Sequence, residues 1–520
     1  MSKFYFVGSG VASLAGAAYL IRDGAVVGTD IVIFEAEKDL GGALDAHGDA
    51  AQGYFMSGSR MFEHHYNATL DLMSFIPSIS DPMLSIKEET ERVETAGEWH
   101  NKSRLVNRDG KVVKFHEMGF SERDRLELLA LMAKSERMLD GKRITDCLGE
   151  HFFTTNFWFE WCSLFAFETW HSAIEFKRYL LRFIHHFATI DTQEQIFRTR
   201  YNQYEAMVVP LVNWLTARGV EFRPNSQVTD LGFAADPKSI TVNSLRYESE
   251  GASHEIPVRD NDYVFVTNGS MTADKTFGSM TAAPAVGKHS GAWSLWESLA
   301  PGRPSFGDPS VFNSHIEESA WESFTVTVND PTFFDLMKAF TGSEPGRGGL
   351  LTFMDSPWLL TLSIFKQPFY LNQPDDVSVW WGYGLYRDKP GDYVKKAMKD
   401  CTGREILEEA LGQLRFDADK EKILASSTCI PCMMPYITSQ FLVRKHGDRP
   451  AVVPDGSKNL AFLGQFAELP DDVVFTVEYS VRTAQVAVYS LLHLDKKPSP
   501  FYKGQHDVSV LWDALKTLHR

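Results

Sequence analysis

The N-terminal segment constrains this chain most, because an apolar strand, a glycine-rich turn and a helix follow one another there without a gap. The apolar run Phe4–Val7 has the length of a buried strand, and the segment Gly8-Ser-Gly-Val-Ala-Ser13 comes directly after it. Gly8 permits a tight turn, Gly10 lets the backbone approach a phosphate, and the free N–H groups at the helix start favour negative charge. We therefore predict a dinucleotide site at this turn, lined also by Ala12 and by Ser13 at the third glycine position.

A second strand supports this prediction and narrows the choice of cofactor. The apolar run Ile31–Phe34 ends in Glu35, at the spacing expected for a carboxylate that binds a ribose. Gly41 and Gly42 follow six residues later and predict another tight loop. The combination of a terminal glutamate with this glycine pair is typical of proteins that bind FAD rather than NAD.

Two later segments are expected to complete the FAD site. The apolar run Tyr263–Thr267 leads into a turn whose amides can face a ligand, and Leu460–Leu463 leads to Gln465 and then to an amphipathic helix over 476–492. Ordinary sheet strands with ordinary loops are the alternative interpretation. The residues expected at the cofactor from these segments are Asn268, Gly269, Ser270, Gln465, Thr476 and Ser480.

The fold class that we expect is α/β, with a Rossmann-like FAD-binding domain assembled from residues 1–66, 200–284 and 455–495. Residues 67–199 follow a helical period and are expected to contribute to the active site, and residues 496–520 are expected to form a helical tail. Residues 285–454 are predicted to form an inserted antiparallel sheet for substrate binding. Its expected strands are Ser323–Asn329, Leu350–Met354, Leu359–Phe365 and Val377–Tyr386.

Composition excludes several other classes of protein. A net charge of −16 argues against nucleic acid as a partner, because phosphate binding needs a concentrated basic face. Five scattered cysteines indicate a reducing compartment, and the close pair Cys429 and Cys432 is expected to be two buried thiols rather than a redox or zinc site. We therefore expect no metal.

Because Met1 lies only three residues before the first strand, no secretory signal is visible and a cytoplasmic location is expected. The apolar stretch Phe152–Phe183 carries several charges and is expected to be a buried helix rather than a membrane span.

Long segments of this chain resemble the fatty acid hydratases, also called oleate hydratases or myosin-cross-reactive antigens, from about residue 3 to 517. The resemblance implies addition of water to a cis double bond of a free unsaturated fatty acid, as in the conversion of oleic acid to 10-hydroxystearic acid. It also implies that FAD is required without net oxidation or reduction. The segments that carry the resemblance are Tyr19–Gly24, Phe165–Ser172, Tyr201–Tyr204, Thr267–Thr272, Met434–Ser439, Gly447–Pro450 and Asp471–Thr476.

Hydration of an unactivated alkene needs a positioned acid to protonate one carbon and a base to take a proton from the attacking water. The resemblance places the proton-donating tyrosine at Tyr179. A phenol has a pKa of about 10 and is a weak acid unless its neighbours assist. The alternative is a buried tyrosine that forms a structural hydrogen bond.

The loop that carries the family's water-activating glutamate differs in this chain. The family's Arg-Gly-Gly-Arg-Glu-Met appears here as Ser57–Phe62, and Met61 stands at the position of the glutamate. Methionine cannot accept a proton. We expect Glu63 to serve as the base, with His64, His65 or an ordered water as alternatives, and we expect Ser59, Arg60 and Met61 to contact the flavin.

The residues that bind the substrate carboxylate are also only partly retained. The family's glutamine matches Gln203, whereas its threonine, asparagine and histidine fall on Ser363, Phe365 and Phe369. The two phenylalanines cannot donate hydrogen bonds, so the head group must be held differently, and Lys366 is a candidate.

Two other functions stay open from the sequence. One is a redox flavoenzyme that acts on a long apolar substrate, such as an oxidase, a desaturase or an isomerase, and the other is a non-catalytic lipid-binding flavoprotein. The ends of the chain lack the family's extensions, so we expect a monomer with at most transient contact with membrane surfaces.

Overall fold

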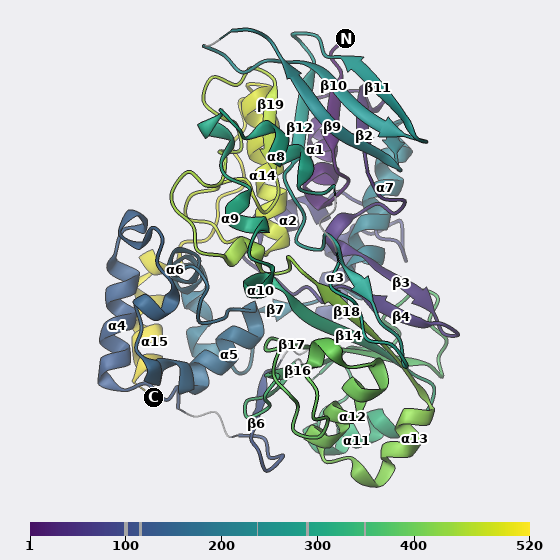
Figure 1. Cartoon of the computed structure of the whole chain (residues 1–520), viewed down its shortest axis with the longest axis vertical. Coiled ribbons are helices and arrows are strands. Elements are labelled where there is room, and N and C mark those ends of the chain that lie inside the picture. The colour runs from purple at the N-terminus through teal and green to yellow at the C-terminus, as the bar shows by residue number, and fades with distance from the viewer. Residues whose placement is uncertain (98–101, 114–116, 237, 288–290, 348–349, 520) are drawn as a thin grey trace.

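The computed structural model describes residues 1–97, 102–113, 117–236, 238–287, 291–347 and 350–519 of the 520-residue chain (Figure 1). Within these residues, no helix combines the length and the apolar character that crossing a membrane requires.

The N-terminal strand lies in the middle of a parallel sheet that has five strands in the described part of the chain. All neighbouring strands in this sheet are parallel, as expected for a dinucleotide-binding α/β fold. The strands in spatial order are β19 (Leu460–Leu463), β12 (Tyr263–Thr267), β1 (Phe4–Val7), β2 (Ile31–Phe34) and β8 (Glu221–Arg223).

Two helices from opposite ends of the chain pack against each other beside this sheet: α1 (Val11–Arg22) and α14 (Val477–Leu491). The small and apolar side chains of α1 from Leu14 to Leu20 are fully buried, which explains why an alanine-rich sequence forms this helix. A short helix α7 (Val209–Thr216) also packs on α1. An antiparallel sheet follows in the chain, formed by β9 (Ser226–Phe233), β10 (Val242–Ser249) and β11 (Ala252–Pro257).

A second large sheet, with seven strands among the described residues, lies at the other end of the molecule in Figure 1. Each strand predicted in this region is present with ends within two residues of the prediction: β14 (Trp321–Val328), β15 (Leu350–Phe353), β16 (Leu360–Ile364) and β17 (Ser378–Gly384). These strands pair antiparallel, as predicted.

The remaining strands of this sheet come from three parts of the sequence: β6 (Arg104–Val106), β13 (Thr276–Phe277) and β18 (Ser427–Met434). Strand β6 pairs parallel with β15, so the segment predicted as helical contributes an edge strand. The cysteines of β18, Cys429 and Cys432, are buried free thiols. Three helices lie along the lower side of the sheet in Figure 1: α11 (Thr332–Thr341), α12 (Gly403–Leu414) and α13 (Lys420–Ala425).

Helices α4 (Glu122–Ala133), α5 (Asn156–Phe165), α6 (Ala173–Arg182) and α15 (Val508–Leu518) gather at one side of the molecule (Figure 1). The stretch Phe152–Phe183 is largely buried, as expected, but it forms more than one helix, because Ala166 adopts a left-handed conformation (φ 60°) that ends α5. The C-terminal helix α15 packs against the short helix Ile184–Thr189, so the tail returns to the middle of the sequence.

Shorter elements connect these layers. They are α2 (Asn67–Met73), α3 (Ile86–Thr95), α8 (Ser294–Leu299), α9 (Ser310–Asn313), α10 (Ile316–Ser319) and the two-stranded pairs β3 (Ala46–Asp49) with β4 (Gly53–Met56) and β5 (Phe62–Glu63) with β7 (Ile196–Phe197). The domain boundaries expected from the sequence stay a prediction.

Candidate active site

The glycine turn after β1 leaves open space at the start of α1. Gly8 has a φ of +87°, a backbone conformation that residues with a side chain rarely adopt. Its N–H donates to the carbonyl of Phe34 at 2.9 Å. A Cβ atom placed on Gly10 would meet no other atom within 4 Å. The backbone at Gly10 can therefore approach a bulky anion closely, as a pyrophosphate site requires.

Glu35 and the glycine pair are hydrogen-bonded to this turn. The backbone N–H and the hydroxyl of Ser9 donate to Oε2 of Glu35 at 2.8 and 2.6 Å. The N–H of Gly41 donates to the Ser9 hydroxyl at 3.2 Å, and Gly41 has a φ of +110°. A Cβ atom on Gly42 would lie 3.2 Å from Cα of Gly10, so the two glycine loops are in contact.

Ser13, the residue at the third glycine position, faces the sheet. Its hydroxyl lies 3.1 Å from the hydroxyl of Thr267 at the end of β12, and both it and Ala12 are buried. The serine thus contributes a hydrogen bond between helix and sheet where a glycine would contribute only close packing.

The turn after β12 holds an amide that lacks partners. Asn268 is 1% exposed, and neither its side-chain nitrogen nor its oxygen has a hydrogen-bond partner among the described residues. Gly269 follows with a φ of +58° beside the ring of Trp293, and the Ser270 hydroxyl lies near that of Thr272. Because an unsatisfied buried amide is costly, this arrangement fits a ligand that supplies both a donor and an acceptor.

At the end of β19, the side chain of Gln465 forms hydrogen bonds with the start of α14. Its amide nitrogen donates to the carbonyl of Thr476 at 2.9 Å and to the hydroxyl of Ser480 at 2.7 Å. The Thr476 hydroxyl caps α14 by accepting from the N–H of Tyr479 at 3.1 Å. All of these groups lie at the carboxyl ends of the parallel strands, where ligands of such sheets bind. The residues present therefore fit a dinucleotide.

The loop Ser57–Phe62 lies next to a segment that the sequence analysis did not select. Strand β5 pairs antiparallel with β7 through Phe62 and Phe197, and this pairing brings Arg198 beside the loop. Arg198 donates to the Ser59 hydroxyl and, at 3.3 Å, to the carbonyl of Arg60. Gln203 donates to the same carbonyl at 3.3 Å.

Arg60 and Arg198 are two cations with no carboxylate within ion-pair distance among the described residues. Desolvation lowers the pKa of each guanidinium to about 10, so both remain charged at neutral pH. Arg60 lies over the ring of Phe475 at 5.2 Å, while Arg198 lies over Phe365 at 5.4 Å. The site is therefore electropositive.

Tyr179 lies on α6 and is 1% exposed, with its hydroxyl donating to the carbonyl of Val474 at 2.5 Å. Burial, and then the neighbouring Tyr66 and Glu175, raise the pKa of Tyr179 well above the ordinary value of a phenol, while Arg60 acts in the opposite direction. The hydroxyl is therefore protonated at neutral pH and can serve only as a proton donor.

Glu63 lies in a separate cluster of charged and imidazole groups. Its carboxylate is 2.9 Å from the guanidinium of Arg182, 3.2 Å from Nε2 of His185 and 3.1 Å from Nδ1 of His65. Although burial opposes ionisation, hydrogen bonds from His185, His186 and His65 and the charge of Arg182 hold the pKa of Glu63 well below its usual range. A carboxylate with so low a pKa is a weak base.

The Glu63 cluster also has a spacing that a metal ion could use. One donor atom each from Glu63, His65 and His185 lie within 4.8 Å of one another. The Arg182 guanidinium on the same carboxylate already balances its charge, however, so the geometry is that of an ion-pair cluster. Tyr502 of the C-terminal tail stacks on His65 with 3.9 Å between ring centroids and covers the cluster.

The remaining predicted residues lie in three different places. Ser363 is buried beside Arg198, and Phe365 and Phe369 stack on each other with centroids 4.0 Å apart. His64 is exposed and hydrogen-bonds to Glu94 on α3, so it points away from this site. Met61 is partly buried in the loop before β5.

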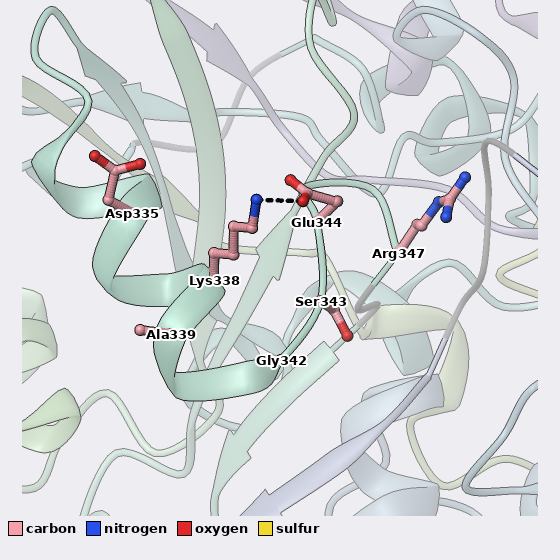
Figure 2. A pocket seen from close by; sticks show the side chains of 7 residues that line it. All are labelled: Asp335, Lys338, Ala339, Gly342, Ser343, Glu344 and Arg347. Carbon is pink, nitrogen blue, oxygen red and sulfur yellow. Dashed lines mark ion pairs between the residues drawn. The ribbon is translucent and has the colours of Figure 1, made fainter.

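A surface pocket lies near the predicted substrate strands but carries none of the predicted site residues (Figure 2). It is formed by the end of α11 and the following loop, and Lys338 is paired there with Glu344. The backbone and Cβ atom of Lys366 lie close to Gly346 of this loop. Its role as a substitute donor for the substrate head group stays a prediction.

Sequence reasoning missed Arg182, Arg198 and Thr267. Arg198 interrupts an otherwise apolar strand end just before the Tyr201–Tyr204 segment, and this was the available signal. The partners of Arg182 and Thr267 come from distant parts of the chain, so only the folded structure reveals them.

Comparison with solved structures shows the class of fold: the Rossmann-like architecture of this chain is similar to that of oxidoreductases of known structure. An oxidoreductase from Methanosarcina mazei matches with a TM-score of 0.52 at 12% identity, covering 94% of this chain and all of that one. Cyclohexylamine oxidase from Brevibacterium oxydans IH-35A matches with a TM-score of 0.52 at 12% identity, over 95% of this chain and 99% of that one. At these identities the likeness concerns the fold alone.

The family is defined by sequence. The model of the MCRA family matches residues 1–489, and the chain belongs to this family. It is 36% identical to an oleate hydratase of Streptococcus pyogenes serotype M49 (strain NZ131), over 99% of this chain and 89% of the relative. It is 32% identical to a linoleate hydratase of Lactiplantibacillus plantarum, over 94% of this chain and 93% of the relative.

Proposed function

We propose that this protein is a fatty acid hydratase that adds water to a cis double bond of a free, long-chain unsaturated fatty acid, with FAD as its cofactor. The observation that carries the proposal is the protonated, buried phenol of Tyr179 close to the positive charge of Arg60. The named activities of the two relatives support the same reaction and do not favour a redox enzyme.

FAD would be held by the turn at Gly8 and Gly10, by Glu35, by the unpaired amide of Asn268 and by the N-terminus of α14. When bound, FAD would supply a fixed charge distribution to the active site, without net oxidation or reduction.

Tyr179 would give its proton to one carbon of the double bond. Its hydroxyl would leave the Val474 carbonyl to do so, and the charge of Arg60 would stabilise the phenolate that forms. Water would add to the other carbon, and the proton that it loses would return to the phenolate, so that Tyr179 ends as the neutral phenol. Glu63 is a poor candidate for the base, because its oxygens already bind Arg182 and the imidazoles. We propose instead that it fixes the segment that follows the Met61 loop.

Incubation of the FAD-loaded protein with oleic and linoleic acids in heavy-oxygen water tests the reaction. Mass spectrometry should find a hydroxy fatty acid carrying one heavy oxygen, with no oxygen uptake and no lasting change in the flavin spectrum. Substrate-dependent bleaching followed by oxygen uptake would replace the hydratase with a redox enzyme. Unchanged acids that nevertheless bind would indicate a lipid-binding protein.

A further inference from the structure

Arg198 is a buried cation whose described contacts are all neutral. It is 2% exposed and contacts the hydroxyl of Ser59, the carbonyl of Arg60 at 3.3 Å and the hydroxyl of Ser363 at 3.3 Å. No carboxylate of the described residues lies within 4.0 Å of its guanidinium, whereas buried Arg178, Arg182, Arg444 and Arg482 each have one.

An uncompensated buried charge is strongly destabilising, so a protein that retains one gains by binding an anion there. The planar guanidinium matches a carboxylate particularly well, because two parallel N–H groups can bind its two oxygens. Solvent screening is also weak at such a site, so the attraction is strong.

The groups around Arg198 suit the head of a fatty acid. Ser363 and Gln203 carry a hydroxyl and an amide that can donate to carboxylate oxygens, and both already connect to Arg198, directly or through the Arg60 carbonyl. The stacked rings of Phe365 and Phe369 add an apolar surface directly beside the guanidinium. The set therefore offers one cation and two polar donors next to an apolar surface.

We propose that Arg198 binds the carboxylate of the fatty acid substrate, with Ser363 and Gln203 as additional hydrogen-bond donors. This inference rests on the proposed function, because it assigns the head-group site of the same substrate.

Binding without turnover tests this site directly. Lauric acid and dodecanol have the same chain length and no double bond, and differ in the carboxylate. The FAD-loaded protein should bind lauric acid at least about thirtyfold more tightly than dodecanol in calorimetric titrations, as expected for a buried charge pair. Arg198→Gln should remove this preference and leave dodecanol binding unchanged. Equal affinity for the two ligands in the unmodified protein would overturn the proposal, whether or not the protein hydrates oleic acid.

Turnover provides the second measurement. With oleic acid, Arg198→Gln should raise KM by about thirtyfold or more with a smaller change in kcat, and Arg198→Lys should restore part of the loss. Arg200→Gln, a substitution of a partly exposed arginine two residues along the chain, is the matched control and should change neither constant. Loss of FAD from Arg198→Gln and Arg198→Lys alike, with acid binding intact after reloading, would instead assign Arg198 to the flavin.

Discussion

At the scale of single residues, the site contains one charged group that is paired with opposite charge and two that are not. The carboxylate of Glu63 is paired with a guanidinium and with imidazole groups. Arg60 and Arg198, in contrast, contact only neutral groups among the described residues. The first arrangement pairs buried charges of opposite sign and stabilises the folded chain. The second is incomplete and suits the binding of an anion.

Tyr179→Phe removes only the hydroxyl that we propose as the proton donor. We expect the variant to fold and to retain FAD, and we expect its hydration rate to fall by at least about a hundredfold, the usual contribution of a general acid. Steady-state kinetics, with flavin absorbance as the measure of loading, check this. An unchanged rate would mean that the proton comes from another group.

Glu63→Gln tests the ion-pair cluster through the pH dependence of stability. Because the pKa of Glu63 is lowered in the folded state, its contribution to stability is complete above the unfolded value of about 4.3 and is lost as the pH falls through the folded value. We expect Glu63→Gln to lower the stability at pH 7 by about 3 kcal/mol, because Arg182 stays buried without its partner.

The difference in Tm between this variant and the unmodified protein should narrow as the pH falls below about 4. A difference that stays constant from pH 7 to pH 3.5 would contradict an ionised Glu63. A large loss of kcat in fully folded, FAD-loaded Glu63→Gln would return this residue to the role of base.

At the scale of elements, the strand, turn and helix at the N-terminus were predictable because their signals are local. Short apolar runs, glycines and a terminal glutamate fix β1, α1 and β2, and the strands of the second sheet follow from alternation. The break at Ala166 and the strand β6 were not predictable. Ala166 has no intrinsic preference for a left-handed conformation, and β6 is a three-residue strand defined by its distant partner β15.

The candidate site divides in the same way. Gly10, Glu35 and Gln465 have sequence signals of their own, whereas the environment of Arg198 arises from β7, the Met61 loop and β16 together. A residue whose partners lie more than a hundred positions away cannot be assigned a partner from one sequence.

Gly10→Ala separates cofactor binding from folding. Gly10 has a φ of −63°, which alanine adopts freely, and the added methyl group would meet no protein atom. We therefore expect an unchanged Tm in the FAD-free protein and markedly weaker FAD binding, because the methyl group would occupy the space of the pyrophosphate. Equilibrium dialysis with FAD measures the affinity.

Gly41→Ala is the contrasting control. Its Cβ atom would lie 2.7 Å from the Val208 side chain in a residue with a φ of +110°, so the FAD-free protein itself should lose stability. Unaltered FAD affinity in Gly10→Ala would place the pyrophosphate elsewhere.

At the scale of the whole molecule, segments that are distant in sequence complete the parallel sheet and cover the Glu63 cluster. The C-terminal tail is the clearest case, since Tyr502 covers His65 and α15 packs on residues 184–189. The nucleotide sheet itself ends with β19 and α14, before this tail begins.

Removal of residues 498–520 should therefore affect the two regions differently. We expect a lower Tm and faster hydrogen exchange at residues 184–189, because the cover of the Glu63 cluster is lost. FAD binding should persist, since α14 and every strand of the parallel sheet remain. Loss of FAD from a truncated protein that is still folded would show that the tail supports the cofactor site.

The order of strands in the parallel sheet has a consequence for how the chain is made. Strand β1 leaves the ribosome before the other strands of this sheet, yet its neighbour β12 begins at residue 263, and β19, the neighbour of β12, begins at residue 460. At roughly 5–20 residues per second, the ribosome needs roughly 13 to 52 seconds to go from β1 to β12, and roughly 23 to 91 seconds to go from β1 to β19. Strands β1 and β2 can pair with each other early, but β1 lacks its second partner until β12 is made, and β12 in turn lacks β19 until still later. Apolar strand edges therefore stay unpaired longer than in a chain with consecutive domains, and we expect a correspondingly greater need for chaperones.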